Sequence, residues 1–214
     1  PKLRAAQSWI RENILDRIPL HDAAHGFVAG RSTVSNATAH LNQAVVIKLD
    51  IKDFFPSITF RRTKGLFHRA LGFGEAAATI LALLCTEPPR VTAEYDGQRY
   101  RVAVDERALP QGACTSPAIT NILCRRLDAR LAGLTRRFGF RYTRYADDLT
   151  LSGPTGDRAV VGQLLGGTQR IVTDEGFTVH PDKVGVYRAG RQQRVTGIVV
   201  NEKLNLDRRS LKQF

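Results

Sequence analysis

The chain has 214 residues, of which 43% are hydrophobic and 24% charged, as in ordinary globular proteins. This length is enough for one sizeable core, or a core with a small appendage. The 32 Lys and Arg against 20 Asp and Glu give a formal net charge of +12, which indicates a polyanionic partner. Nucleic acid is the simplest such partner, and an anionic membrane surface is the alternative. No apolar run approaches the roughly 20 residues of a membrane span, and the first residues do not resemble a signal peptide.

The cysteines, Cys85, Cys114 and Cys124, are odd in number and have no Cys-x-x-Cys spacing. They predict reduced thiols in a cytoplasmic protein and exclude a disulfide framework and a zinc site. The sequence has no methionine, even at position 1, so we expect it to begin inside a longer protein.

The first third of the chain predicts two helices and a strand. Apolar residues recur at helical spacing from Trp9 to Ile18. A glycine-containing connector follows at 21–32, and we expect Ser35 to cap a second helix. Residues 45–51 form a mostly apolar run that predicts a buried strand, with Asp50 near its carboxyl end, where functional sites collect on mixed sheets.

The middle of the chain predicts helices and a hairpin, namely helices over 60–71 and 75–84 and a hairpin over 91–103 around Asp96-Gly97. Ser116 and Pro117 are expected to be the N-cap and first residue of a further helix that continues to Leu131. The start of this helix would offer free N–H groups to phosphate, with Gln111-Gly112 just before it.

Residues 140–152 predict two short antiparallel strands whose tight turn carries Asp147 and Asp148. A solvated Asp-Asp turn is the simpler interpretation. The alternative is a hard cation such as Mg²⁺, which prefers carboxylate oxygen. If the strand that ends at Asp50 pairs with this hairpin, Asp50 and Asp147 can share two ions roughly 3.5–4 Å apart. Consecutive strand residues point to opposite faces, so we rank Asp148 below Asp147 unless the chain bends.

The last part of the chain predicts a helix over 159–171, weakened at Gly166-Gly167. A second hairpin is expected from the strand-like runs 195–200 and 204–206. Asp207 is expected to cap a helix that begins near the end of the chain.

Three ordered motifs resemble those of reverse transcriptases. Tyr145-Ala146-Asp147-Asp148 resembles their acidic signature, residues 49–58 resemble their first palm motif, and residues 109–117 resemble their Pro-Gln-Gly motif. Residues 26–32 are similar to the Gly-Phe-x-x-Gly-Arg-Ser element of the fingers. Two shorter elements resemble those of bacterial retron reverse transcriptases, namely Asn36-Ala37-Thr38-Ala39-His40 and Val195-Thr196-Gly197.

The resemblance implies an α+β fold: a polymerase right hand with an antiparallel palm sheet backed by helices, helical fingers and a truncated thumb. The implied boundaries are fingers at 1–44, the first catalytic palm motif at 45–60, a fingers insertion at 61–108, palm at 109–194, a primer-grip hairpin at 195–206 and the start of the thumb at 207–214. The implied activity is RNA-directed DNA synthesis with two Mg²⁺ ions, with Mn²⁺ as the alternative ion.

The resemblance also implies roles for single residues. Catalysis and metal binding fall to Asp50, Asp147 and Asp148, with the backbone carbonyl of Ile51 as a further metal ligand. Substrate binding falls to Asp53, Phe54, Phe55, Gln111, Gly112 and Lys183. In this assignment Phe55 excludes a 2′-hydroxyl, the group that distinguishes RNA from DNA, and Lys183 protonates the pyrophosphate. A core phenylalanine and a solvated lysine are the respective alternatives.

Nucleic-acid contact is implied for Arg31, Asn36, His40, Tyr145, Val195, Thr196 and Gly197. For His40 the alternative is a histidine that is hydrogen-bonded within the fold. The implied partners are a structured non-coding RNA that serves as template and as primer through a 2′-hydroxyl, its DNA product (msDNA), dNTPs and a defence effector protein, with no membrane partner. Two other interpretations stay open: a group II intron-like or other defence-associated reverse transcriptase, and a non-catalytic RNA-binding scaffold of the same fold.

Overall fold

The computed structural model describes residues 2–206, and these form two compact units. One unit combines the N-terminal segment up to Pro19 with Asp53–Leu123. The other combines Leu20–Lys52 with the chain from Cys124 onward. Within the described range no helix has both the length and the apolar character needed to cross a bilayer.

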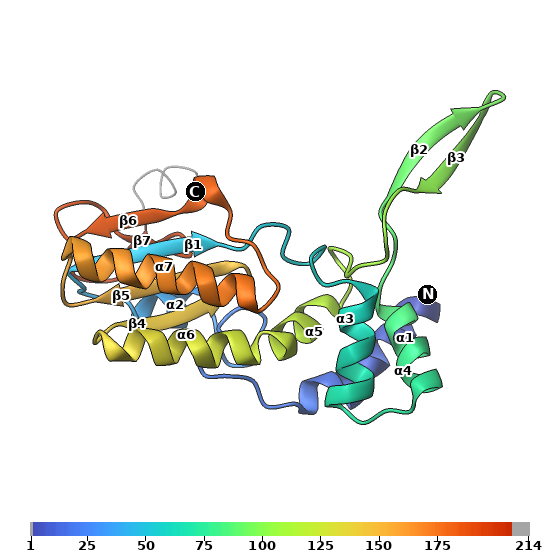
Figure 1. Cartoon of the computed structure of the whole chain (residues 1–214), viewed down its shortest axis with the longest axis horizontal. Helices are drawn as coiled ribbons and strands as arrows, with labels where there is room; N and C mark the ends of the chain where they lie inside the picture. Colours follow the sequence, from blue (N-terminus) through green and yellow to red (C-terminus); the bar gives the residue numbers. More distant parts are fainter. Residues whose placement is uncertain (1, 207–214) are drawn as a thin grey trace. The chain divides into compact units, whose positions relative to one another are not determined.

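The second unit is built on a four-stranded antiparallel sheet with the order β4-β5-β1-β6 (Figure 1). Its strands are β1 Val45–Asp50, β4 Arg141–Tyr145, β5 Asp148–Gly153 and β6 Gly185–Arg188. β1 pairs on one side with β5 and on the other with β6. The predicted pairing of the first strand with the acidic hairpin is therefore confirmed. The edge strand β6 was not predicted.

One face of this sheet is mostly apolar and is covered by the helices α6 (Arg125–Arg137) and α7 (Arg158–Asp174), as Figure 1 shows. Side chains alternate along a strand, so Ile47 and Leu49 of β1 share this face with Leu151 of β5, and all three are fully buried. α7 runs unbroken through the glycine pair that was expected to weaken it. This layer holds most of the core of the unit.

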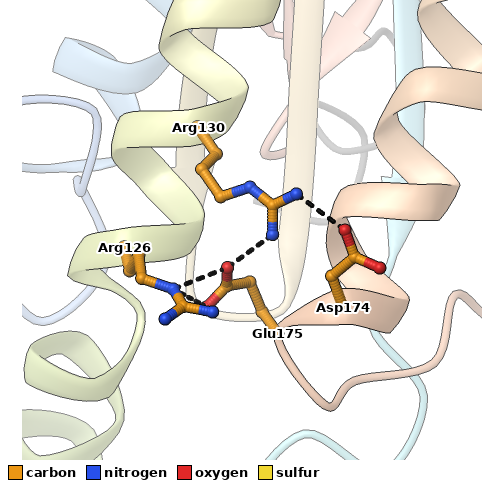
Figure 2. Close-up of polar contacts among 4 residues, drawn as sticks. All are labelled: Arg126, Arg130, Asp174 and Glu175. Atoms are coloured by element: carbon orange, nitrogen blue, oxygen red, sulfur yellow. Dashed lines mark hydrogen bonds and ion pairs between the residues drawn. The ribbon is translucent and has the colours of Figure 1, made fainter.

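α6 and α7 are joined at one end by charged side chains (Figure 2). Arg126 Nε donates to both carboxylate oxygens of Glu175 at 2.9 Å. The guanidinium of Arg130 donates to Glu175 Oε1 and to Asp174 Oδ2, both at 2.7 Å. The carboxylates lie at the C-terminal end of α7, where a helix dipole disfavours negative charge, so the arginines offset that cost. Arg126 and Arg130 thus pair within the fold.

The opposite face of the sheet meets α2 (Thr33–Thr38) and a small second sheet. Ala37, Val46, Val195 and Val200 form a buried cluster there. The small sheet consists of β7 Arg194–Val195, β8 Ile198–Val199 and β9 Asn205–Leu206. The prediction of one continuous strand over 195–200 is wrong, because the chain turns at Thr196 and Gly197, whose φ angles are 46° and 83°.

α2 begins three residues earlier than predicted. Its N-cap is Ser32, whose hydroxyl accepts from the backbone N–H of Ser35. The Ser35 hydroxyl in turn accepts from the backbone N–H of Ser32, which completes a capping box. Ser35 therefore caps the helix from its third position.

The first unit is helical with one hairpin. Its elements are α1 Lys2–Asn13, the 3-10 turn η1 Leu15–Arg17, α3 Phe60–Gly65 continuing into a π-helical turn at Leu66–Ala70, α4 Glu75–Cys85, α5 Ser116–Leu123 and the hairpin strands β2 Arg90–Tyr95 and β3 Gln98–Ala103. The hairpin turn was correctly predicted, with Asp96 and Gly97 both at positive φ. Helix α5 already includes Ser116, so the predicted cap lies one residue too late. The predicted continuous helix to Leu131 divides at Cys124 into α5 and α6.

The predicted fingers, palm and primer-grip boundaries remain predictions. The two units divide the chain differently, because residues 20–44 group with the sheet and 109–123 group with the helical unit. The predicted start of the thumb at 207–214, including Asp207, lies outside the described residues.

Candidate active site

Three carboxylates come from the ends of two adjacent strands. Asp50, the last residue of β1, lies directly opposite Asp148, the first residue of β5. Cross-strand partners project from the same face, so these two side chains are neighbours. Asp147 precedes Asp148 in the turn, and its carbonyl accepts from the Ile51 N–H at 3.0 Å. The acidic hairpin is thus bonded to the end of β1.

The turn between β4 and β5 has two residues, Ala146 and Asp147. Ala146 has a φ of 55°, a conformation that costs a non-glycine residue roughly 1–2 kcal/mol. Consecutive residues of a strand point to opposite faces, so only a bend of this kind lets Asp147 and Asp148 face one site. The backbone of Gly26 packs so closely on the turn that an added Cβ would lie 2.5 Å from Ala146 N. The turn is therefore held in a strained shape by its surroundings.

Burial and mutual repulsion disfavour the charged carboxylates. Burial raises the pKa of Asp147, and the negative charges of Asp50 and Asp148 raise it further. Burial likewise raises the pKa of Asp148, with Asp50 contributing to the same effect. Such repulsion is typical of carboxylates that await a cation.

Two lysines supply the nearest positive charges. Lys183 Nζ lies 3.0 Å from both carboxylate oxygens of Asp50, and this hydrogen bond raises the pKa of Lys183. Lys48 Nζ lies 4.0 Å from Asp148 Oδ1. Lys48 is two residues before Asp50 on β1 and therefore shares its face of the sheet.

A pocket of about 270 Å³ opens beside these groups. Its lining combines acidic and basic side chains with residues of β6: Lys48, Asp50, Asp148, Asp182, Lys183, Val184, Gly185 and Tyr187. Mixed charges around an open pocket suit a ligand that carries both phosphate groups and bound cations.

The type of ligand atom at this site fits a hard divalent cation, but within the described part of the chain too few ligands converge to hold the cation by themselves. Carboxylate oxygens are the ligands that Mg²⁺ prefers. Among residues 2–206, however, no three His, Cys, Asp or Glu side chains converge as a ready-made metal site. Mg²⁺ in nucleotide enzymes is commonly held by one or two carboxylates together with substrate phosphates. The residues present therefore fit an ion that binds with its nucleotide, and the metal role of Asp50, Asp147, Asp148 and the Ile51 carbonyl remains a prediction.

The predicted substrate-binding residues other than Lys183 lie in the first unit. Phe54 is buried and its ring centroid is 5.6 Å from that of the half-buried Phe55. Asp53 is exposed at a φ of 48°, in the turn that follows the end of β1. Gln111 and Gly112 form an exposed turn in which Gly112 has a φ of 93°, a conformation that glycine adopts without strain. Their roles remain predictions.

Three residues predicted to contact nucleic acid have no exposed surface: Asn36, His40 and Val195. His40 Nδ1 is 2.7 Å from Ser152 Oγ, and His40 Nε2 is 2.7 Å from Thr143 Oγ1. Val195 belongs to the apolar cluster behind the sheet. In this conformation their side chains offer no surface to a partner, and their contact with nucleic acid remains a prediction. The structural interpretation of His40 holds.

The other predicted nucleic-acid contacts remain predictions. Arg31 is partly exposed and donates to the Asp22 carbonyl at 3.0 Å. The ring of Tyr145 lies 6.5 Å from that of Phe27, whose side chain is exposed. Thr196 Oγ1 donates to the Thr33 carbonyl at 3.1 Å, and Gly197 completes the turn that follows.

Sequence reasoning missed Lys48, Asp182 and Tyr187, which line the pocket. For Lys48 a signal was present, because a lysine in an apolar strand two residues before an acid must share that acid's face. Tyr187 had no comparable signal, since it belongs to the short strand β6.

Comparisons with known proteins identify the family of this chain. The family model described as "Reverse transcriptase (RNA-dependent DNA polymerase)" matches residues 2–200. Retron Mx162 reverse transcriptase of Myxococcus xanthus is 53% identical over 209 residues, which cover 94% of this chain and 43% of that protein. Retron Ec86 reverse transcriptase of Escherichia coli is 32% identical over 214 residues, which cover all of this chain and 60% of that protein. The chain thus spans about half the length of these curated relatives.

A solved structure supports the fold. Apo telomerase from Candida tropicalis aligns with a TM-score of 0.61 and 12% sequence identity, over 96% of this chain and 44% of that chain. At this identity the likeness concerns the fold alone. The predicted α+β right-hand fold is confirmed. The match of the family model across nearly the whole sequence shows that this chain belongs to the reverse transcriptase family, and its curated relatives are retron reverse transcriptases.

Proposed function

We propose that the protein is an RNA-directed DNA polymerase of retron type, which copies a dedicated structured non-coding RNA into DNA. The observation that carries this proposal is the meeting of Asp50 and Asp148 across adjacent strands, with Asp147 in the turn beside them. The identity of up to 53% with retron reverse transcriptases supports the retron assignment.

In this proposal Asp50, Asp147 and Asp148 hold two Mg²⁺ ions, with the Ile51 carbonyl as a further ligand. Ions bound there would activate the primer hydroxyl and neutralise charge on the triphosphate. The raised pKa values of Asp147 and Asp148 support this assignment, since a bound cation would relieve the repulsion between the carboxylates.

The residues around the acids have separate roles in the proposed reaction. Lys183 leaves Asp50 and donates a proton to the pyrophosphate, or neutralises its charge. Before that step Lys183 is paired with Asp50 as the charged ammonium, and this pairing raises its pKa. Phe55 excludes the 2′-hydroxyl of a ribonucleotide, and Gln111 with Gly112 positions the incoming nucleotide.

The proposed RNA serves as template and, through a 2′-hydroxyl, as primer. The net charge of +12 supports a phosphate-rich partner of this kind. A role in anti-phage defence together with an effector protein, in the cytoplasm, completes the proposal by analogy with retron systems.

Substitution of a single acid tests the enzymatic part of the proposal. We expect Asp147→Asn in the intact protein to lower the rate of dNTP incorporation on a primed RNA by at least about 100-fold, because the amide is neutral and a weaker ligand. The matched control is Asp96→Asn, which makes the same change in the exposed turn of the β2–β3 hairpin.

Three outcomes would count against the proposal. If Asp147→Asn incorporates nucleotides as fast as Asp96→Asn and the wild type, Asp147 is not a catalytic group. If the wild type itself incorporates no nucleotide on its cognate RNA, a non-catalytic scaffold is favoured. If the wild type copies an unrelated primed template at the same rate as its cognate retron RNA, the retron assignment fails while the polymerase assignment stands.

A further inference from the structure

The largest fully buried side chain among residues 2–206 is a charged one, Arg144 of β4. Its Nε and Nη2 donate to the two carboxylate oxygens of Asp128 on α6, each at 2.8 Å. Tyr142, two residues earlier and on the same face of the sheet, donates its hydroxyl to Asp128 Oδ1 at 2.8 Å. Neither Asp128 nor Arg144 has any exposed side-chain surface. A buried ion pair is seldom retained for stability alone, because apolar residues of similar volume often stabilise as well or better.

The same guanidinium also reaches the acidic turn. Arg144 Nη1 donates to the carbonyl oxygen of Ala146 at 3.1 Å. Ala146 is the strained residue immediately before Asp147. The fork bound to Asp128 fixes the plane of the guanidinium, so the third nitrogen points at this carbonyl from a rigid position.

The backbone of Arg144 is held by the segment 23–25. Its N–H donates to the Ala23 carbonyl at 2.7 Å and its carbonyl accepts from the His25 N–H at 2.8 Å. On the other edge of β4, Arg144 faces Leu149 of the hairpin. The segment 23–25 continues into Gly26, which packs on the turn. Arg144 therefore has little freedom to move away from Ala146.

We propose that Arg144, oriented by Asp128 and Tyr142, is a positioning residue that holds the Ala146–Asp147 turn in the shape required for Asp147 to bind metal. This inference rests on the proposed function, because it assigns Asp147 a metal role. Lysine cannot replace it, since one ammonium cannot span both Asp128 oxygens and also reach Ala146 from a fixed direction. Outer groups that orient metal ligands commonly change metal affinity by about 10–100-fold when they are removed.

A triple variant separates positioning from folding. Asp128→Leu, Tyr142→Phe and Arg144→Met together remove the whole buried polar network and leave no unpaired charge behind, so the fold should be retained. The variant loses the hydrogen bond to Ala146. Arg144→Lys is the second variant, because it keeps a positive charge beside Asp128. Leu131→Ala is the control: it removes a fully buried side chain from α6 and lowers thermal stability without changing a contact of the turn.

The readout is Mn²⁺ binding to the intact protein in the presence of a dNTP that it cannot incorporate, followed by electron paramagnetic resonance at a temperature where all variants are folded. We expect both Arg144 variants to bind Mn²⁺ at least about tenfold more weakly than the wild type, and Leu131→Ala to bind like the wild type. Wild-type Mn²⁺ affinity in either folded Arg144 variant would overturn the inference. If the triple variant does not fold, Arg144→Lys decides.

Failure of this inference is distinguishable from failure of the proposed function. If Asp147→Asn abolishes nucleotide incorporation while the folded Arg144 variants bind Mn²⁺ normally, only the positioning role is refuted. If the wild type neither binds Mn²⁺ nor incorporates nucleotides, the proposed function is refuted, and the positioning role that rests on it falls with it.

Discussion

At the scale of single residues, the second unit buries one histidine in its neutral form. Both ring nitrogens of His40 bond to hydroxyl groups, and no part of the side chain is exposed. Burial lowers the pKa of His40 to about 3, and the charges of His25 and Arg141 contribute in the same direction. The folded chain thus keeps this histidine neutral where an unfolded chain would protonate it.

This difference predicts a pH-dependent stability. Between about pH 6.5 and pH 3 the unfolded state binds a proton at His40 and the folded state does not, so the free energy of unfolding falls as the pH falls. The slope from this residue approaches about 1.4 kcal/mol per pH unit within that window. Urea titrations at a series of pH values measure it, and His40→Gln should flatten the curve. His68→Gln, which makes the same change at an exposed histidine, serves as the control. If it flattens the curve as much as His40→Gln does, the pH dependence does not come from His40.

At the scale of elements, the acidic hairpin depends on a neighbouring segment as well as on its own strands. Gly26 lies against the Ala146 backbone with no room for a side chain, although its own φ is not in the left-handed region. The requirement for glycine at this position is thus a requirement for close approach rather than for an unusual backbone conformation.

Gly26→Ala should therefore displace the turn. We expect it to lower the free energy of unfolding by about 1–3 kcal/mol and to reduce nucleotide incorporation, because the new methyl group meets backbone rather than a flexible side chain. The control is Gly133→Ala in α6, where an added Cβ meets nothing within 4 Å. That change should leave activity intact and stabilise the helix by up to about 1 kcal/mol. Equal activity of both variants would show that the turn tolerates the displacement.

At the scale of the whole molecule, the parts that could be predicted from sequence were those with local signals. The strand β1 was marked by the mostly apolar run 45–51, and the β2–β3 hairpin by Asp96-Gly97. Strand β6 was missed because it has four residues, begins at Gly185 and is recognisable only by its pairing with β1. The break at Thr196-Gly197 was missed because the flanking residues are all strand-forming.

In the candidate site, too, only the features with local sequence signals could be predicted. The proximity of Asp50 to the 147–148 pair could be predicted because their motifs are short and contiguous. The network of Arg144 and Asp128 was not found, since its members come from different elements and a buried arginine cannot be distinguished from a surface one by sequence alone. The burial of Asn36, His40 and Val195, which were predicted to contact RNA, could not be predicted either, because burial is a property of the folded state.

In the proposed function, Asp50, Asp147 and Asp148 catalyse the copying of an RNA into DNA. The most direct test is to purify the intact protein from its cells, as wild type and as Asp50→Asn, and to sequence the RNA and DNA bound to each. We predict that the wild type carries a covalent RNA–DNA hybrid and that Asp50→Asn carries the same RNA without DNA. The same hybrid on both proteins, or the same RNA without DNA on both, would contradict the account.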